Sequence, residues 1–204
     1  MTDPAYSALI DSARDPHDMA TLALAGVMAM AGSRPSPYDV PIAGVDRRAV
    51  RGLIARYFPT LDPAPWIEAS AATEWSDSPR LDEFQDLVDL LSAHASHDTE
   101  ECRLIALAIA TASMGANHLW QDMGLPNRGV LSRLIEQDFT SLYVRNVGDM
   151  KWKKFFYRQL CEKAEVRICK SPSCGICIDF NVCFGKDELG VPGHFTIVSE
   201  HGHR

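Results

Sequence analysis

Long apolar runs are absent from the sequence. The longest, from Met19 to Ala31, covers about 13 residues, whereas a helix needs roughly 18 to 20 apolar residues to cross a bilayer. The opening residues also lack the basic start, apolar segment and small-residue cleavage site of an export signal. We therefore expect a soluble, cytoplasmic protein that neither spans a membrane nor is exported.

Positive charge and recognisable catalytic motifs are also scarce. The chain has a formal net charge of −7, and no known nucleic-acid-binding motif accompanies its basic residues, so we expect no nucleic-acid partner. No glycine-rich phosphate loop, Ser-His-Asp order or paired-carboxylate motif stands out. These absences disfavour a catalytic function, although a redox enzyme stays open.

Strand-like alternation is absent before residue 165, and apolar residues recur instead at helical spacing. Helices are predicted over residues 3–14, 17–31, 46–57, 79–94, 98–115, 118–122, 126–138 and 149–165. Residues 60–79 hold three prolines and mixed polarity, which predicts a long connection with at most one turn of helix. The sequence therefore predicts an all-α fold. A single-domain irregular helical bundle over residues 1–165 is followed by a cysteine-rich, cluster-binding loop and flexible tail over residues 166–204.

Four of the predicted helices have a clear apolar face. Its members are Val50, Leu53, Ile54 and Tyr57; Leu81, Phe84, Leu87, Val88 and Leu91; Val130, Leu131, Leu134 and Ile135; and Trp152, Phe155, Phe156 and Leu160. Helices 79–94 and 98–115 are expected to pack against each other as an antiparallel hairpin. These faces predict the core of the bundle.

Cysteine is rare except in one segment. Four of the six cysteines lie within the stretch CKSPSCGICIDFNVC, at Cys169, Cys174, Cys177 and Cys183, with the spacing C-x4-C-x2-C-x5-C. Disulfides need an oxidising compartment and are commonest in small secreted domains with a weak core. A chain of 204 residues, 46% of them apolar and without an export signal, meets neither condition. The four thiols therefore predict a metal or cluster site.

Two kinds of metal site remain open for these thiols. Zinc is usually held by two short cysteine pairs with a longer segment between them, whereas this stretch has three short spacings and no long one. Such spacing suits a single loop wrapped around a larger cluster. The first three cysteines also match the C-x4-C-x2-C run of plant-type ferredoxins, although the fourth comes too early in the chain for that family. The spacing favours an iron–sulfur type cluster and leaves zinc as the alternative.

The residues around this segment resemble a known family. The run MKWKKFFYRQLC from Met150, followed by CKSPSCGICIDFNVCFG, closely resembles the nitrogen-fixation family NifQ, whose mark is this four-cysteine spacing near the C-terminus. The stretch NHLWQDMGLPNRGVLSRLIEQDF, residues 117–139, is also similar, so the resemblance covers at least residues 117–185.

The resemblance implies a function that spacing and composition alone could not indicate. It implies a carrier of a molybdenum–iron–sulfur cluster, with iron and molybdenum bound at the four cysteines. Such a carrier supplies molybdenum to the assembly of the iron–molybdenum cofactor of nitrogenase. The implied partners are the NifEN scaffold and the nitrogenase iron protein.

Two further residues are weaker candidate ligands. Cys161 precedes Cys169 by eight residues, on the last predicted helix, and His118 lies beside Trp120 in the stretch that resembles the family. A packed thiol and a hydrogen-bonded structural histidine are the ordinary alternatives. Cys102 lies within an apolar helix and is expected to belong to the core.

The region before the cysteines is locally basic. Between Arg145 and Lys170, eight Lys or Arg face three Asp or Glu, a balance of +5 in a chain whose total is −7. This charge either is a solvated helix face or serves the site, by lowering thiol pKa values and by attracting an acidic partner. On the second interpretation, Lys153, Lys154 and Arg158 are candidate docking residues.

Three functions therefore remain at the level of sequence. The leading one is a non-enzymatic molybdenum carrier. The alternatives are an iron–sulfur electron-transfer protein or redox enzyme, and a zinc-stabilised interaction module.

Overall fold

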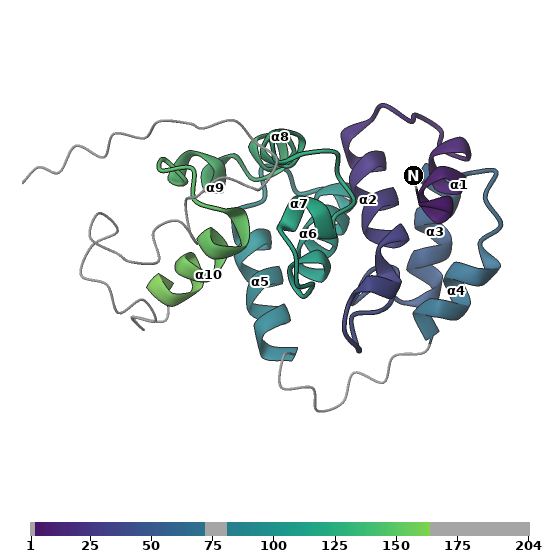
Figure 1. Ribbon diagram of the computed structural model, residues 1–204, viewed down its shortest axis with the longest axis horizontal. Helices are drawn as coiled ribbons and strands as arrows, with labels where there is room; N and C mark the ends of the chain where they lie inside the picture. The colour runs from purple at the N-terminus through teal and green to yellow at the C-terminus, as the bar shows by residue number, and fades with distance from the viewer. Residues whose placement is uncertain (1–2, 72–80, 164–204) are drawn as a thin grey trace, which may run out of the picture. The chain divides into compact units, whose positions relative to one another are not determined.

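A computed structural model describes residues 3–71 and 81–163 of the chain (Figure 1). Every regular element in these ranges is a helix: α1 (Pro4–Asp11), α2 (Met19–Ala29), the 3₁₀ turn η1 (Ala31–Ser33), α3 (Arg47–Tyr57), α4 (Ala64–Ala71), α5 (Leu81–Ala93), α6 (Glu100–Ser113), α7 (Leu119–Asp122), α8 (Arg128–Asp138), α9 (Thr140–Arg145) and α10 (Trp152–Lys163). The predicted all-α class is confirmed for this part of the chain. The predicted boundary at residue 165 and the cysteine-rich loop lie outside the described residues.

Short polar side chains fix where several helices begin. In each case the side chain accepts a hydrogen bond from a backbone N–H of the first turn, which would otherwise lack a partner. The pairs are Asp18 with Thr21 at 2.9 Å, Asp46 with Ala49 at 2.7 Å, Thr99 with Cys102 at 3.1 Å, and Asn127 with Val130 at 3.1 Å.

The chain divides into two compact units, and the first ends at Val144. Within it, α6 packs against α2, α5 and α7, and Figure 1 shows α6 between α2 and α5. The α6 side chains Ile105, Ile109 and Ala112 are fully buried, and Cys102 is 1% exposed, as expected of a core thiol. The predicted pairing of residues 79–94 with 98–115 is confirmed by the contact between α5 and α6. No helix in the described ranges is long and apolar enough to cross a membrane.

Helix α2 approaches the turn after α7 so closely that glycine is required on both sides. A Cβ added at Gly26 would overlap the carbonyl oxygen of Met123, and a Cβ at Gly124 would come within 2.7 Å of the Gly26 Cα. Gly124 also has a φ of +62°, in the left-handed region that favours glycine. The two glycines therefore allow direct backbone contact between α2 and this turn.

A buried arginine organises the connection between α2 and α3. Arg34 is 4% exposed, and its guanidinium donates to the carbonyl oxygens of Val27 at 2.9 Å, Tyr38 at 2.7 Å and Val40 at 2.7 Å. Burial lowers the pKa of Arg34 to about 10, with two nearby carboxylates acting in the opposite direction, so the group stays charged at neutral pH. One side chain thus links a carbonyl of α2 to two carbonyls of the irregular segment that follows.

Two elements differ from the sequence prediction. Residues 60–79 were predicted to contain at most one turn of helix, which is wrong because α4 forms over Ala64–Ala71. The Asp62 carboxylate accepts from the Ala64 N–H at 3.0 Å, and Pro65 lies in the first turn, where proline costs no hydrogen bond. The six-residue helix α9 was not predicted. It begins where the Thr140 N–H donates to the Ser96 hydroxyl at 3.0 Å, a contact across 44 positions of sequence.

The predicted apolar faces are mostly confirmed. The predicted members on α3 and α8 are all buried, and on α8 Asp138 is buried in addition. On α5, Phe84, Leu87 and Leu91 are buried as predicted, but Leu81 and Val88 are only half-buried, and Leu90 is buried in addition. The inner face of α5 is therefore rotated slightly from the one predicted.

The second unit begins at Arg145 and is described as far as Lys163. Its helix α10 buries Trp152, Phe155 and Phe156, whose ring centroids lie 5.7 to 6.1 Å apart in tilted and edge-on arrangements. The predicted aromatic face is thus confirmed for these three residues, while Leu160 is half-buried. This cluster fixes the helix that leads into the cysteine segment.

Candidate functional site

The four cysteines of the predicted cluster site lie outside the described residues. Helix α10 ends at Lys163, six positions before Cys169. The structure therefore describes the segment that enters the site, from the loop before α10 to its last turn.

The loop before α10 is closed by one asparagine. The Asn146 side chain donates to the carbonyl oxygen of Met150 at 2.9 Å and accepts from the Met150 N–H at 2.9 Å. The Asp149 N–H donates to the Asn146 carbonyl at 3.0 Å, and Asp149 has a φ of +49°, a left-handed conformation that aspartate tolerates better than most residues. This bonding sets the direction in which α10 leaves the loop.

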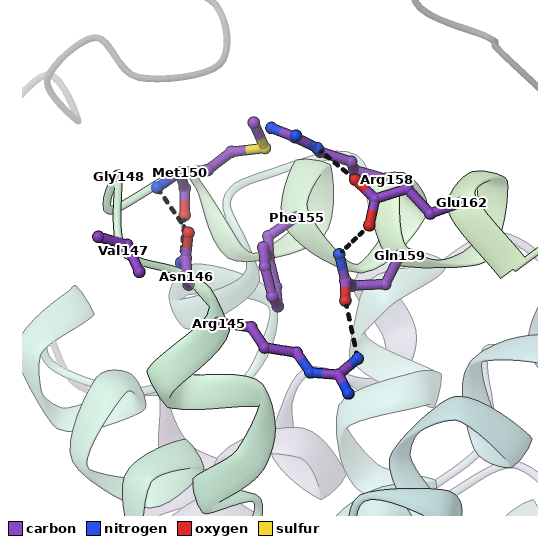
Figure 2. Close-up of a pocket in the computed structure, with 9 residues that line it drawn as sticks. All are labelled: Arg145, Asn146, Val147, Gly148, Met150, Phe155, Arg158, Gln159 and Glu162. Atoms are coloured by element: carbon purple, nitrogen blue, oxygen red, sulfur yellow. Dashed lines mark hydrogen bonds and ion pairs between the residues drawn. The ribbon is translucent and has the colours of Figure 1, made fainter. Parts of the chain in front are cut away.

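A cavity of about 450 Å³ lies between this loop and α10 (Figure 2). Its lining comes from Arg145, Asn146, Val147, Gly148 and Met150 on the loop side, and from Phe155, Arg158, Gln159 and Glu162 on α10. Figure 2 shows the Phe155 ring between Asn146 and Gln159. Val147 is 85% exposed, so the loop side of the cavity also presents an apolar side chain to solvent.

Four polar side chains form a connected row along one wall of this cavity. Arg145 donates to the Gln159 amide oxygen at 3.4 Å, Gln159 donates to Glu162 at 2.9 Å, and Arg158 donates to the same carboxylate at 2.8 Å. Glu162 therefore compensates much of the Arg158 charge. The sequence did not indicate this cavity. The cavity depends on the loop that Asn146 closes, and that closure follows no recognisable sequence motif.

The candidate docking residues on α10 differ in exposure. Lys154 and Arg158 are exposed on the same side of the helix, four positions apart, whereas Lys153 is half-buried. Because Arg158 is paired with Glu162, Lys154 is the better placed of the exposed pair to attract an acidic partner. A docking role for the three residues stays a prediction.

The two weaker candidate ligands occupy ordinary structural positions. Cys161 lies in the last turns of α10, half-buried, as a free thiol. His118 precedes α7, half-buried, and its backbone N–H donates to the Gln121 side chain at 3.1 Å. Among the described residues, His, Cys, Asp and Glu side chains nowhere gather in a group of three that could hold a metal ion. A ligand role for either residue stays a prediction.

Comparison with known families shows which family the chain belongs to. The sequence model of the NifQ family matches residues 23–185, which include both the described α10 entry segment and all four cysteines from Cys169 to Cys183. The chain belongs to the NifQ family. The match extends well beyond residues 117–185, where the resemblance was first visible, and NifQ membership gives the chain a role in nitrogen fixation.

Named NifQ proteins are similar to the chain, two of them over more than two thirds of its length. Protein NifQ of Azotobacter vinelandii is 39% identical over 152 residues, which cover 71% of this chain and 77% of that protein. Protein NifQ of Rhodobacter capsulatus is 35% identical over 157 residues, covering 77% of this chain and 82% of that protein. Protein NifQ of Klebsiella pneumoniae is 49% identical over a shorter stretch of 82 residues, covering 39% of this chain and 48% of that protein. No solved structure matches the chain significantly.

Proposed function

We propose that this NifQ protein carries a molybdenum–iron–sulfur cluster and donates its molybdenum to the assembly of the nitrogenase iron–molybdenum cofactor. The observation that carries the proposal is the compact C-x4-C-x2-C-x5-C of residues 169–183, which lies inside the stretch matched to NifQ. Four thiols of this spacing are a soft donor set, which suits iron–sulfur clusters better than hard, oxygen-bound cations. Cys169, Cys174, Cys177 and Cys183 are the ligands, and the metal is cargo rather than a resident cofactor.

Local charge supports cluster binding at this end of the chain. Thiols bind metals as thiolates, and a cluster held by four of them is anionic. The balance of +5 between Arg145 and Lys170 lowers the cost of gathering that negative charge in a chain of −7. Cys161, the free thiol on α10, is the remaining sulfur donor on the chain's path into the segment.

The protein acts as a donor in the cytoplasm rather than as an enzyme. Its partners are the NifEN scaffold, which receives the molybdenum, and the nitrogenase iron protein. The basic residues of α10, Lys153, Lys154 and Arg158, contribute to docking, with Lys154 the more important of the exposed pair because Glu162 compensates Arg158. Attraction of this kind speeds encounter and weakens with salt.

Metal analysis tests the proposal directly. Protein isolated without oxygen is expected to contain molybdenum, iron and acid-labile sulfide and to give an electron paramagnetic resonance signal. The four Cys→Ser substitutions at the predicted ligands are each expected to lower all three contents together. Zinc as the sole metal, held by four thiols in a colourless protein, would instead assign the chain to the interaction-module alternative. A cluster without molybdenum that cycles reversibly by one electron would assign it to electron transfer or redox catalysis.

A further inference from the structure

The exposed side of α3 carries a cluster of arginines. Arg47, Arg48 and Arg51 are all exposed, and within residues 3–71 and 81–163 none of their side chains has a hydrogen bond or an ion pair. The next arginine of the helix differs, because Arg56 pairs with Glu101 of α6 at 3.2 Å. Three neighbouring guanidinium groups therefore stand uncompensated by the described part of an acidic chain.

The positions of these arginines destabilise the helix that carries them. Arg47 and Arg48 occupy the first turn, where the partial positive charge of the helix N-terminus disfavours a cation. Arg51 lies four positions after Arg47 and three after Arg48, the spacings at which like charges on a helix repel each other. The residues on this face are not those that would stabilise α3.

The described fold does not require the glycine beside them, Gly52. Gly52 lies inside α3, where glycine is less favourable than alanine, and it is exposed. A Cβ at Gly52 would have no atom within 4 Å, so no contact of the described fold requires the missing side chain. Because Gly52 has no side chain, the helix backbone is accessible at this position, which lies four residues after Arg48 on the same side of the helix.

We propose that this α3 arginine face, formed by Arg47, Arg48, Arg51 and Gly52, is a docking surface for an acidic protein. Arginine forks bind carboxylates in pairs of parallel hydrogen bonds, and Gly52 lets the partner's surface come close to the helix. The chain as a whole has a net charge of −7 and is therefore repelled by a nucleic acid. This repulsion favours a protein partner with a local acidic patch. This inference rests on the proposed function in one respect: the acidic partner is the protein that receives the molybdenum.

Matched pairs of substitutions test the surface. The cluster-loaded full chain, its Arg48→Gln/Arg51→Gln variant and an Arg103→Gln/Arg133→Gln control are each titrated with the NifEN scaffold. Arg103 and Arg133 are exposed on α6 and α8, so the control removes the same charge from elsewhere. The Arg48/Arg51 variant is expected to bind about tenfold more weakly at low salt, and the control within about twofold of the parent, with the difference shrinking as salt rises.

A steric pair at Gly52 supplies a test that does not depend on charge. Gly52→Ala is expected to leave binding unchanged, whereas Gly52→Gln is expected to weaken it at every salt concentration, because a longer side chain stands between the helix and the partner. Circular dichroism and thermal melting of each variant confirm that the helix is retained.

The outcomes separate this inference from the proposed function. If the parent binds the scaffold and passes on molybdenum while the Arg48/Arg51 variant does both equally well, the function stands and the inference is overturned. It is also overturned if that variant loses binding only to a short DNA duplex, which would assign the face to phosphates. If the loaded parent neither binds the scaffold nor passes molybdenum to it, the proposed function is wrong, and the inference falls with it because the scaffold is its stated partner.

Discussion

At the scale of single residues, Arg34 shows how one side chain can support an irregular segment. Its guanidinium is buried and donates to the Val27 carbonyl of α2 and to the Tyr38 and Val40 carbonyls of the segment between α2 and α3. Lysine has the same charge but not the planar fork, so it cannot reproduce three divergent hydrogen bonds. We expect Arg34→Lys to lower the free energy of unfolding by about 2 to 4 kcal/mol, because carbonyls lose their donor and a buried cation loses its partners.

Urea denaturation of the parent and the Arg34→Lys variant measures this loss. Arg133→Lys, at an exposed position on α8, is the matched control and should leave the unfolding free energy nearly unchanged. Equal stability of the Arg34→Lys variant and the parent would mean that the three hydrogen bonds do not support the fold.

Asp138 makes stability depend on pH. Burial raises the pKa of this carboxyl from 3.8 to about 6, with the negative charge of Glu101 adding to the effect and His97 opposing it. The folded protein therefore holds the proton more tightly than the unfolded chain, so this group's contribution is greatest below about pH 4 and is lost as pH rises through 6. We expect Asp138→Asn, which resembles the protonated acid, to be more stable than the parent at pH 7.5 by on the order of 1 kcal/mol.

Chemical denaturation at pH 4 and pH 7.5 decides this prediction. The difference between the two proteins should nearly vanish at the lower pH, because the parent then carries the proton itself. A difference that is the same at both values would show that Asp138 does not titrate between them in the folded protein.

At the scale of elements, two helical glycines respond oppositely to the same substitution. Gly52→Ala in α3 is expected to raise the free energy of unfolding by about 1 kcal/mol, because the added Cβ meets nothing and alanine is the better helix former. Gly26→Ala in α2 is expected to lower it by more than about 2 kcal/mol, because the Cβ would overlap the carbonyl oxygen of Met123.

Thermal and urea unfolding of the two variants, compared with the parent, measures both signs. A stabilised Gly26→Ala variant would contradict the close approach of α2 to the turn after α7. A destabilised Gly52→Ala variant would mean that the glycine serves a contact of the folded chain after all.

The helices that the sequence predicted and those it missed differ in what stabilises them. Helix α3 was predicted from a local signal, its apolar face at helical spacing, and in the structure the Asp46 side chain caps its first turn. Helix α9 was missed because it has only six residues and its first N–H bonds to Ser96, which no local pattern reveals. Helix α4 was missed because prolines were interpreted as breaks, although Pro65 lies in the tolerant first turn.

At the scale of the whole molecule, the spacing of the cysteines predicts a candidate site that lies outside the described residues. Four cysteines in C-x4-C-x2-C-x5-C predict a metal or cluster site by themselves, and the surrounding residues identify the family. The cavity beside α10 was not predictable, because it depends on the loop that Asn146 closes and on the row from Arg145 to Glu162. Pairings of that kind appear only once the backbone has folded.

The transfer of molybdenum tests the central claim most directly. Cluster-loaded protein, prepared without oxygen, is mixed with the NifEN scaffold and the nitrogenase iron protein, the proteins are separated again, and molybdenum is measured in each. The account predicts that molybdenum leaves this chain and appears on the scaffold, and that a Cys174→Ser variant delivers far less because it loads less. The contradicting result is a loaded parent that keeps all its molybdenum after mixing while its cluster takes up and releases one electron reversibly.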